Sequence, residues 1–111
     1  MRMWMVDTGI MCRQHLLGEH VEHHMFAAHF AKKRGIDGYV EHNCVEPKSL
    51  QSRHKALVKE MRRRGFNHNS PLKKVSVRIY PDVRVNKKKA LKDLLSRCKE
   101  CRKRYKVRKR G

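Results

Sequence analysis

The chain has 111 residues, a length that suits a single domain with one modest hydrophobic core. Its 29 Lys and Arg exceed its 10 Asp and Glu by a formal net charge of +19, which favours a polyanionic partner. No apolar run approaches the roughly 18–20 residues of a membrane span, and Asp7 interrupts the short N-terminal apolar run, which argues against a secretory signal. The four cysteines are therefore expected to be free thiols in a reducing cytoplasm.

The first predicted helix covers residues 12–34. Four apolar residues recur at helical spacing and predict its buried face: Leu17, Val21, Ala28 and Ala31. A second set, with two carboxylates and an imidazole, falls on the opposite face: His15, Glu19, Glu22 and Phe26. Basic residues precede Gly35, which is expected at the C′ position with a positive φ. Two carboxylates on one stripe of so basic a chain mark this helix as a candidate functional element.

The second predicted helix runs from Pro47 or Ser49 to Arg64 and ends at Gly65. A connection over residues 36–48 precedes it. Its apolar stripe consists of Leu50, Leu57, Val58 and Met61. The turn-forming residues of the segment 66–73 predict a loop after this helix.

Residues 74–80 alternate between apolar and polar, which predicts a short strand or an extended arm. Asn86 is expected to cap a third helix over residues 87–104. The domain is then expected to occupy residues 1–104, with 105–111 as a basic tail.

Residues 73–111 hold 17 basic and 3 acidic residues, which predicts contact with nucleic-acid phosphates. The alternative is a solvated basic helix followed by a disordered tail.

Two motifs in the first 72 residues are specific enough to compare with known families. The first is the Gln-His-Leu-x-x-Glu-x-x-Glu pattern from Gln14 to Glu22, and the second is Arg64-Gly65-Phe66-Asn67. Together they resemble the pyrimidine-dimer DNA glycosylase family, the small phage-type DNA repair enzymes sometimes called endonuclease V. The resemblance covers roughly residues 1–72 and is weak beyond them.

The resemblance implies a compact all-α domain of three helices, with an N-terminal segment that threads beside the first helix. It also implies that the α-amino group of residue 1 and the second Glu of the motif perform the chemistry. These are Met1 and Glu22. Removal of an initiator methionine generally requires a small second residue, so we expect the large Arg2 to preserve Met1. An α-amino group has an ordinary pKa of about 7.7–8.0, against about 10.4 for Lys, so it is the better amine nucleophile near neutral pH.

The implied reaction is attack of the Met1 amine on the sugar C1′, release of the base with formation of an imine, and β-elimination of the 3′ phosphate. Glu22 would stabilise positive charge on the sugar and move protons, supported by His15 and Glu19. We therefore expect a metal-independent glycosylase with AP-lyase activity and no cofactor. Its expected partner is double-stranded DNA with a damaged or abasic site, and no membrane. The protein is expected to be a monomer in the cytoplasm of a bacterial or phage-infected cell.

The residues expected to bind DNA are mostly basic and lie in both halves of the chain: Arg2, Arg13, Gln14, Arg64, Lys87, Lys88, Arg102, Lys103 and Arg104. Val21 and Met25 stand where better-known family members have arginine, and Tyr105 alone matches their C-terminal aromatic cluster. DNA contacts are therefore expected to move to the basic third helix and tail. Trp4 is expected in the core, with base stacking as the alternative.

Metal-binding hypotheses compete with this interpretation. Cys98 and Cys101 form a lone C-x-x-C, which needs two more zinc ligands, from Cys12, Cys44 or a histidine. The alternative is that both cysteines are small buried residues. His20 and His24 are one helical turn apart, but no third ligand has suitable spacing, so no metal site is expected. The rival function is a non-catalytic basic DNA- or RNA-binding protein, with or without a stabilising zinc ion.

Overall fold

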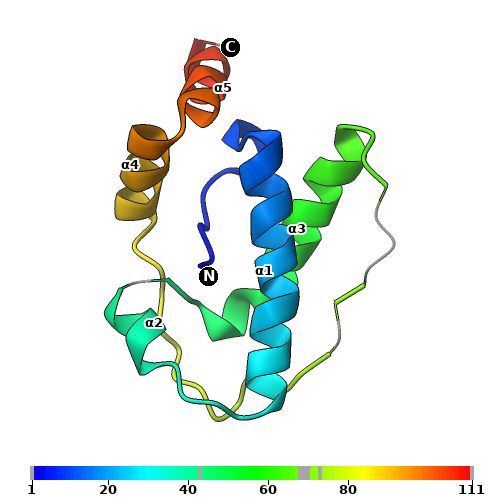
Figure 1. The fold of residues 1–111 in the computed structure, drawn as a ribbon, viewed down its shortest axis with the longest axis vertical. Coiled ribbons are helices and arrows are strands. Elements are labelled where there is room, and N and C mark those ends of the chain that lie inside the picture. Colours follow the sequence, from blue (N-terminus) through cyan, green and yellow to red (C-terminus); the bar gives the residue numbers. More distant parts are fainter. Residues whose placement is uncertain (1, 43, 68–70, 73, 111) are drawn as a thin grey trace.

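A computed structural model describes residues 2–42, 44–67, 71–72 and 74–110. These residues form five α-helices, two 3-10 helices and no strand, which confirms the all-α prediction but with five helices instead of three (Figure 1). The elements in chain order are η1 (Thr8–Ile10), α1 (Arg13–Ala31), α2 (Asp37–Glu41), η2 (Pro47–Ser49), α3 (Leu50–Arg63), α4 (Lys87–Arg97) and α5 (Lys99–Arg110). Within the described part of the chain, no helix is long and apolar enough to cross a membrane.

Helices α1 and α3 pack against each other, and the hydrophobic core between the elements also takes in the N-terminal segment, η1 and α4. The predicted stripe of α3 is confirmed, because Leu50, Leu57, Val58 and Met61 are all buried. The predicted buried face of α1 is wrong: Val21 is 56% exposed, and its two predicted alanines are exposed as well. The apolar residues that α1 does bury are Leu16, Phe26, Ala27 and Phe30. Three polar residues share that buried face and obscure its periodicity: Glu19, His20 and His23.

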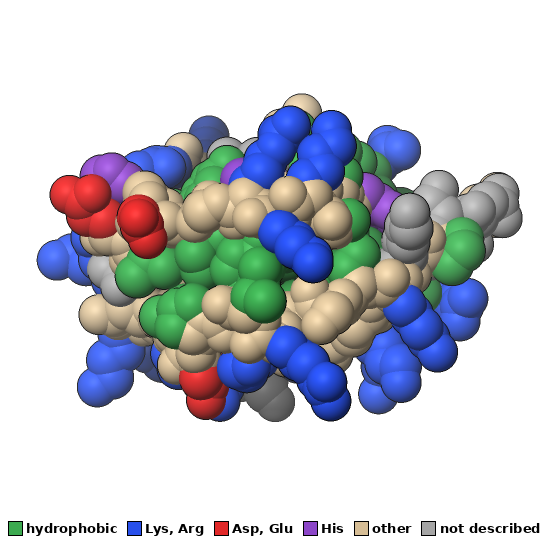
Figure 2. Space-filling model, turned by 90° about the horizontal axis from the view of Figure 1, so that it is seen from below, with side chains coloured by type: hydrophobic (Ala, Val, Ile, Leu, Met, Phe, Trp, Pro, Cys, Tyr) green, Lys and Arg blue, Asp and Glu red, His purple; other side chains and the backbone are tan. Residues whose placement is uncertain are grey.

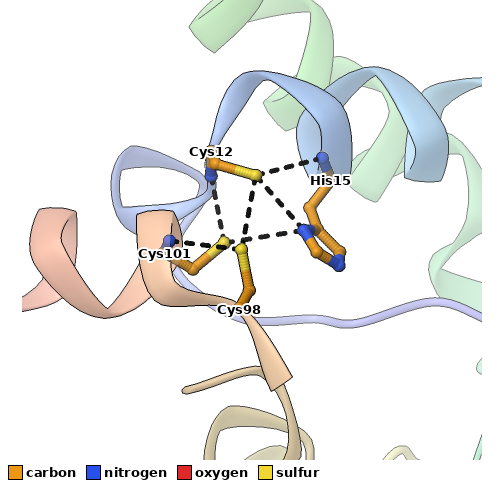
Figure 3. Close-up of side chains that lie close together, drawn as sticks. All are labelled: Cys12, His15, Cys98 and Cys101. Carbon is orange, nitrogen blue, oxygen red and sulfur yellow. Dashed lines mark hydrogen bonds between the residues drawn. The ribbon is translucent and has the colours of Figure 1, made fainter. Parts of the chain in front are cut away.

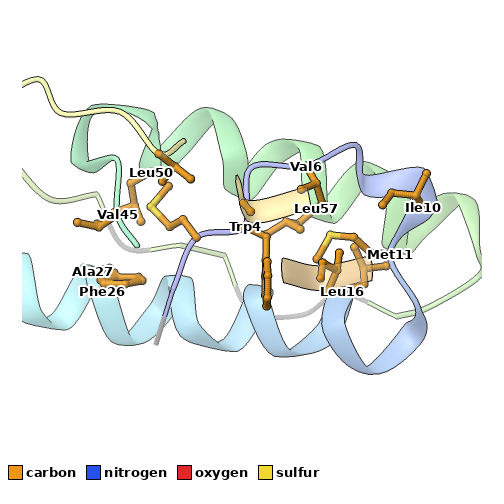
Figure 4. Close-up of a cluster of buried hydrophobic side chains, with 14 of the residues drawn as sticks. Trp4, Val6, Ile10, Met11, Leu16, Phe26, Ala27, Val45, Leu50 and Leu57 are labelled. Atoms are coloured by element: carbon orange, nitrogen blue, oxygen red, sulfur yellow. The ribbon is translucent and has the colours of Figure 1, made fainter. Parts of the chain in front are cut away.

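The N-terminal segment threads between α1 and α3, as predicted. Figure 4 shows Trp4 and Val6 on this segment, with α1 on one side and α3 on the other. The backbone N–H of Met3 donates to the carbonyl oxygen of Cys44 at 2.7 Å, and the Met3 side chain is fully buried. Three apolar side chains of this segment are buried, Met3, Trp4 and Val6, and Met5 between them is partly buried, which fixes the path of the chain start.

The predicted third helix is two helices, α4 and α5, which meet at Cys98. Cys98 has extended backbone angles, φ −120° and ψ 109°, which interrupt the helical hydrogen bonds. The predicted cap is confirmed, because Asn86 Oδ1 accepts a hydrogen bond from the Lys89 N–H at 3.1 Å. The segment predicted as a basic tail is helical as far as residue 110. It packs against η1, where Arg108 pairs with Asp7 at 2.5 Å.

Two further local predictions have different outcomes at the ends of α1 and α3. Gly65 has φ +82° and ends α3 as predicted. After α1 the positive φ belongs to Lys33, at 55°, and not to Gly35.

The predicted strand or arm at residues 74–80 forms no strand in the residues described there, and a turn occupies 78–80. Buried Tyr80 anchors this stretch, because its hydroxyl donates to the Arg34 carbonyl at 2.6 Å.

Positive charge surrounds the folded chain. Figure 2 shows Lys and Arg side chains around the edge of the face seen from below, with few Asp or Glu and an apolar centre. The strong basic block in the sequence, residues 73–111, lies mainly on α4 and α5, which Figure 1 places beside the start of α1 and the N-terminal segment. The fold therefore brings the most basic part of the chain to the end of α1 that carries the Gln-His-Leu motif.

Candidate active site

An open pocket of about 280 Å³ lies where the N-terminal segment, α1 and α4 meet. Residues from all three elements line it: Arg2, Trp4, Gln14, His15, Gly18, Glu19, Glu22 and Arg97. The pocket therefore gathers the catalytic candidate Glu22 and both supporting residues, His15 and Glu19. The other catalytic candidate, Met1, lies outside the described residues. Sequence reasoning missed Arg97, because only the fold places α4 beside the motif.

Glu22 is joined directly to the start of the chain. Its Oε2 atom accepts a hydrogen bond from the backbone N–H of Arg2 at 3.0 Å. The Glu22 side chain is half-buried on the pocket wall. A carboxylate that accepts the N–H of the second residue sits one peptide unit from the end of the chain.

Glu19 has a different environment, one helical turn before Glu22. It is 1% exposed, and both of its carboxylate oxygens accept hydrogen bonds from Arg53, at 2.6 and 2.9 Å. The third nitrogen of the Arg53 guanidinium donates to the carbonyl oxygen of Val6 at 2.6 Å. Glu19 and Arg53 therefore tie α1, α3 and the N-terminal segment together, a structural role that leaves Glu22 as the less occupied carboxylate of the motif.

Arg2 and Trp4 form the wall opposite α1. The Arg2 guanidinium carbon lies 3.8 Å from the centre of the Trp4 ring, and one of its nitrogens lies 3.8 Å from an Asp93 oxygen. The Nε atom of Arg2 is buried and has no hydrogen-bond partner among the described residues. Trp4 is buried as predicted, yet its ring also meets the His15 ring edge to face, at 5.7 Å between centres. The wall thus offers a cation beside an aromatic surface.

The two ring nitrogens of His15 point in different directions. Its Nδ1 atom lies 3.2 Å from the Cys12 sulfur and 3.7 Å from the Cys101 sulfur, and its other ring nitrogen points away from the cysteines (Figure 3). Burial lowers the pKa of His15 from its ordinary value, and the charge of nearby Glu22 partly offsets this effect. His15 is therefore biased toward the neutral form beside the pocket.

The remaining predicted DNA-binding residues divide into two groups. The exposed ones are Arg13, Gln14, Lys87, Lys88, Arg102 and Lys103. Arg64 and Arg104 instead hold η1 in place. Arg64 donates to the carbonyl oxygens of Thr8 and Met11 at 3.1 and 2.7 Å, and Arg104 donates to that of Gly9 at 3.1 and 3.2 Å. Their positive charges are therefore engaged by the protein itself.

A group of three histidines lies on the α1–α3 interface. His20 and His24 of α1 meet His54 of α3, with ring centres 5.0 and 5.5 Å from His54. One ligand atom from each lies within 4.8 Å of the others, the spacing of a possible metal site. The sequence showed no third partner for the first two histidines, because His54 is distant in the chain. Next to this group, burial lowers the pKa of His23.

A comparison with protein families matches this chain to a model described as pyrimidine dimer DNA glycosylase. The match covers residues 1–74, more than half of the chain, and it includes every α1 residue that lines the pocket. Comparisons with curated proteins and with solved structures give no match. On the family match, the chain belongs to the pyrimidine dimer DNA glycosylase family.

Proposed function

We propose that the protein cleaves a glycosidic bond of UV-induced pyrimidine dimers in double-stranded DNA and then nicks the strand as an AP lyase, with the Met1 amine as nucleophile and Glu22 as the acid–base residue. The observation that carries this proposal is the 3.0 Å hydrogen bond between the Arg2 N–H and Glu22. Three covalent bonds separate the Met1 α-amino nitrogen from the Arg2 nitrogen. Covalent geometry limits the distance between the two nitrogens to about 4 Å, which supports the proposal that the amine can reach the Glu22 carboxylate.

The proposed chemistry requires the Met1 amine and the Glu22 carboxylate to act on the same nucleotide. The amine attacks C1′, the glycosidic bond breaks, and the departing base takes up a proton. Opening of the sugar ring leaves an imine between C1′ and the Met1 nitrogen. Glu22 stabilises the cationic sugar and accepts the C2′ proton, whose loss expels the 3′ phosphate. Water then hydrolyses the imine and restores the amine, so the cycle consumes no cofactor and needs no metal ion for its chemistry.

The pocket walls suit a distorted duplex. Arg2 and Arg97 supply cations for phosphates that flank the lesion, and the half-buried His15 lines the pocket where an extruded base would enter. The exposed basic residues of α4 and α5, Lys87, Lys88 and Lys103 among them, supply further positive charge for the DNA backbone. DNA affinity should therefore fall steeply with salt, because each neutralised phosphate releases counterions.

Borohydride trapping tests the reaction and its nucleophile together. The protein is incubated with duplexes that carry a cyclobutane dimer or an abasic site, and borohydride reduces any imine to a stable amine. We expect a covalent adduct whose digested peptide maps to Met1. Mapping of the adduct to a lysine would refute the Met1 assignment, and the absence of cleavage and adduct on both substrates would support the non-catalytic DNA-binding rival.

A Glu22→Gln variant tests the carboxylate. It should keep DNA affinity and lose strand cleavage by about 10²–10⁴-fold, the range typical of general acid–base catalysis. Glu41→Gln is the matched control, because Glu41 is an exposed carboxylate on α2 outside the pocket. Equal cleavage by the Glu22 variant and the control would exclude a catalytic role for Glu22.

A further inference from the structure

We propose that Cys12, His15, Cys98 and Cys101 bind one structural zinc ion that fastens the basic C-terminal helices to the catalytic domain. The four residues form two pairs with the same spacing, C-x-x-H at the start of α1 and C-x-x-C at the start of α5. Cys12 and Cys98 are 86 residues apart in the chain, so only the fold brings the pairs together. The proposal is independent of the catalytic one, because zinc here takes no part in the reaction.

The distances between ligand atoms fit a tetrahedral zinc ion. Zinc bonds of about 2.3 Å to sulfur and about 2.0–2.1 Å to nitrogen place tetrahedral ligand atoms about 3.5–3.8 Å apart. The Cys98 and Cys12 sulfurs are 3.7 Å apart, and His15 Nδ1 lies 3.7 and 3.2 Å from the Cys101 and Cys12 sulfurs. All four ligand atoms lie within 4.8 Å of one another and point toward a common centre (Figure 3). The cysteines are free thiols at these separations, not disulfides.

The backbone around the cluster is arranged for thiolates. Each of the three sulfurs accepts a backbone N–H: Cys98 from Cys101 at 3.4 Å, Cys12 from His15 at 3.5 Å, and Cys101 from Cys12 at 3.1 Å. N–H donors of this kind orient metal ligands and stabilise the negative charge that a zinc-bound sulfur carries. Cys12 caps the N-terminus of α1, and Cys98 immediately precedes α5. Both helices therefore direct their positive dipole ends toward the cluster.

The position of the site defines its role. Cys12 and His15 lie within the matched family region, whereas Cys98 and Cys101 lie beyond residue 74, where the match ends. Helix α5 buries few apolar side chains against the rest of the protein, since many of its residues are basic and exposed. A zinc ion would therefore supply a link between these two regions that apolar packing does not. It would also hold His15, which lines the pocket, through Nδ1 and leave the other ring nitrogen directed away from the cysteines. Zinc would thus position a pocket residue without contacting DNA.

Metal analysis of the full-length protein, purified in the presence of a thiol reductant and without added chelator, is the first test. We expect about one zinc per chain, the stoichiometry of a closed Cys₃His site. Replacement by Co²⁺ should give the visible spectrum of tetrahedral cobalt and thiolate-to-cobalt charge transfer in the near ultraviolet. Cys98→Ser should lose the bound metal, and the matched control Cys44→Ser should keep it, because the Cys44 sulfur bonds only to the His42 carbonyl among the described residues.

Two further variants keep the test decisive if Cys98→Ser fails to fold. His15→Cys should retain cobalt and raise the charge-transfer intensity by about one third, from three thiolates to four. His54→Gln should leave the cobalt spectrum unchanged, which separates this site from the histidine group on α1 and α3. Absence of stoichiometric metal from the reduced wild-type protein would overturn the proposal. So would cobalt that shows no thiolate charge transfer, or metal that persists in Cys98→Ser and disappears in His54→Gln.

Discussion

The buried ion pair between Glu19 and Arg53 is expected to dominate the stability of the fold around the pocket. Replacing Glu19 by Gln keeps the side-chain volume and removes the negative charge, so the Arg53 guanidinium would stay buried, at 7% exposure, without its counter-charge. Removing one partner of a buried pair typically costs about 3–5 kcal/mol. That loss is a large part of the 5–15 kcal/mol by which domains are typically stable. At about 4 °C per kcal/mol for a chain of this length, Tm should fall by roughly 12–20 °C.

Urea unfolding followed by far-ultraviolet circular dichroism measures this loss. Glu22→Gln is the matched control, since Glu22 is half-buried and accepts a single hydrogen bond among the described residues, from the Arg2 N–H. Its replacement should cost less than about 1.5 kcal/mol. The double variant Glu19→Gln with Arg53→Met should recover part of the stability, because no buried charge remains. If Glu19→Gln and Glu22→Gln lose equal, small amounts of stability, the assignment of Glu19 to structure and Glu22 to chemistry is wrong.

Three further predictions concern other parts of the molecule. Hydrogen bonds from Arg63 and Arg64 lower the pKa of Glu60 to about 2 and outweigh burial, which raises it. A depressed pKa contributes stability that is complete above the unfolded pKa of about 4.5 and is lost as pH falls toward 2. Glu60→Gln should therefore make the free energy of unfolding depend less on pH between about 4.5 and 2. A pH dependence parallel to that of the wild type would contradict this. Gly65→Ala should cost about 1–2 kcal/mol in urea unfolding because of its φ of +82°, and equal stability of wild type and variant would refute that strain. Lys88→Ala should reduce the slope of log K for DNA binding against log salt concentration by about 0.9. An unchanged slope would show that Lys88 does not contact a phosphate.

The local features of the chain were readable from its sequence where one interaction decides the conformation. The α3 stripe follows from apolar spacing, the cap at Asn86 from a side-chain oxygen that accepts a nearby N–H, and the end of α3 from a glycine with positive φ. The buried face of α1 was not readable, because its polar residues are buried against partners from other elements. Glu19 lies on that face only because Arg53 of α3 neutralises it.

The sequence by itself also determined the family, since the motif from Gln14 to Glu22 has a specific pattern of residue types. It identified the basic C-terminal third, because charge counts do not depend on folding. Tertiary structure alone decided which distant residues meet. It joined the Arg2 N–H to Glu22 by a hydrogen bond and brought His54 next to His20. It also brought the C-x-x-H at the start of α1 close to the C-x-x-C at the start of α5. The physical reason is that spacing along a helix defines which side chains share a face, whereas packing between elements defines what that face contacts.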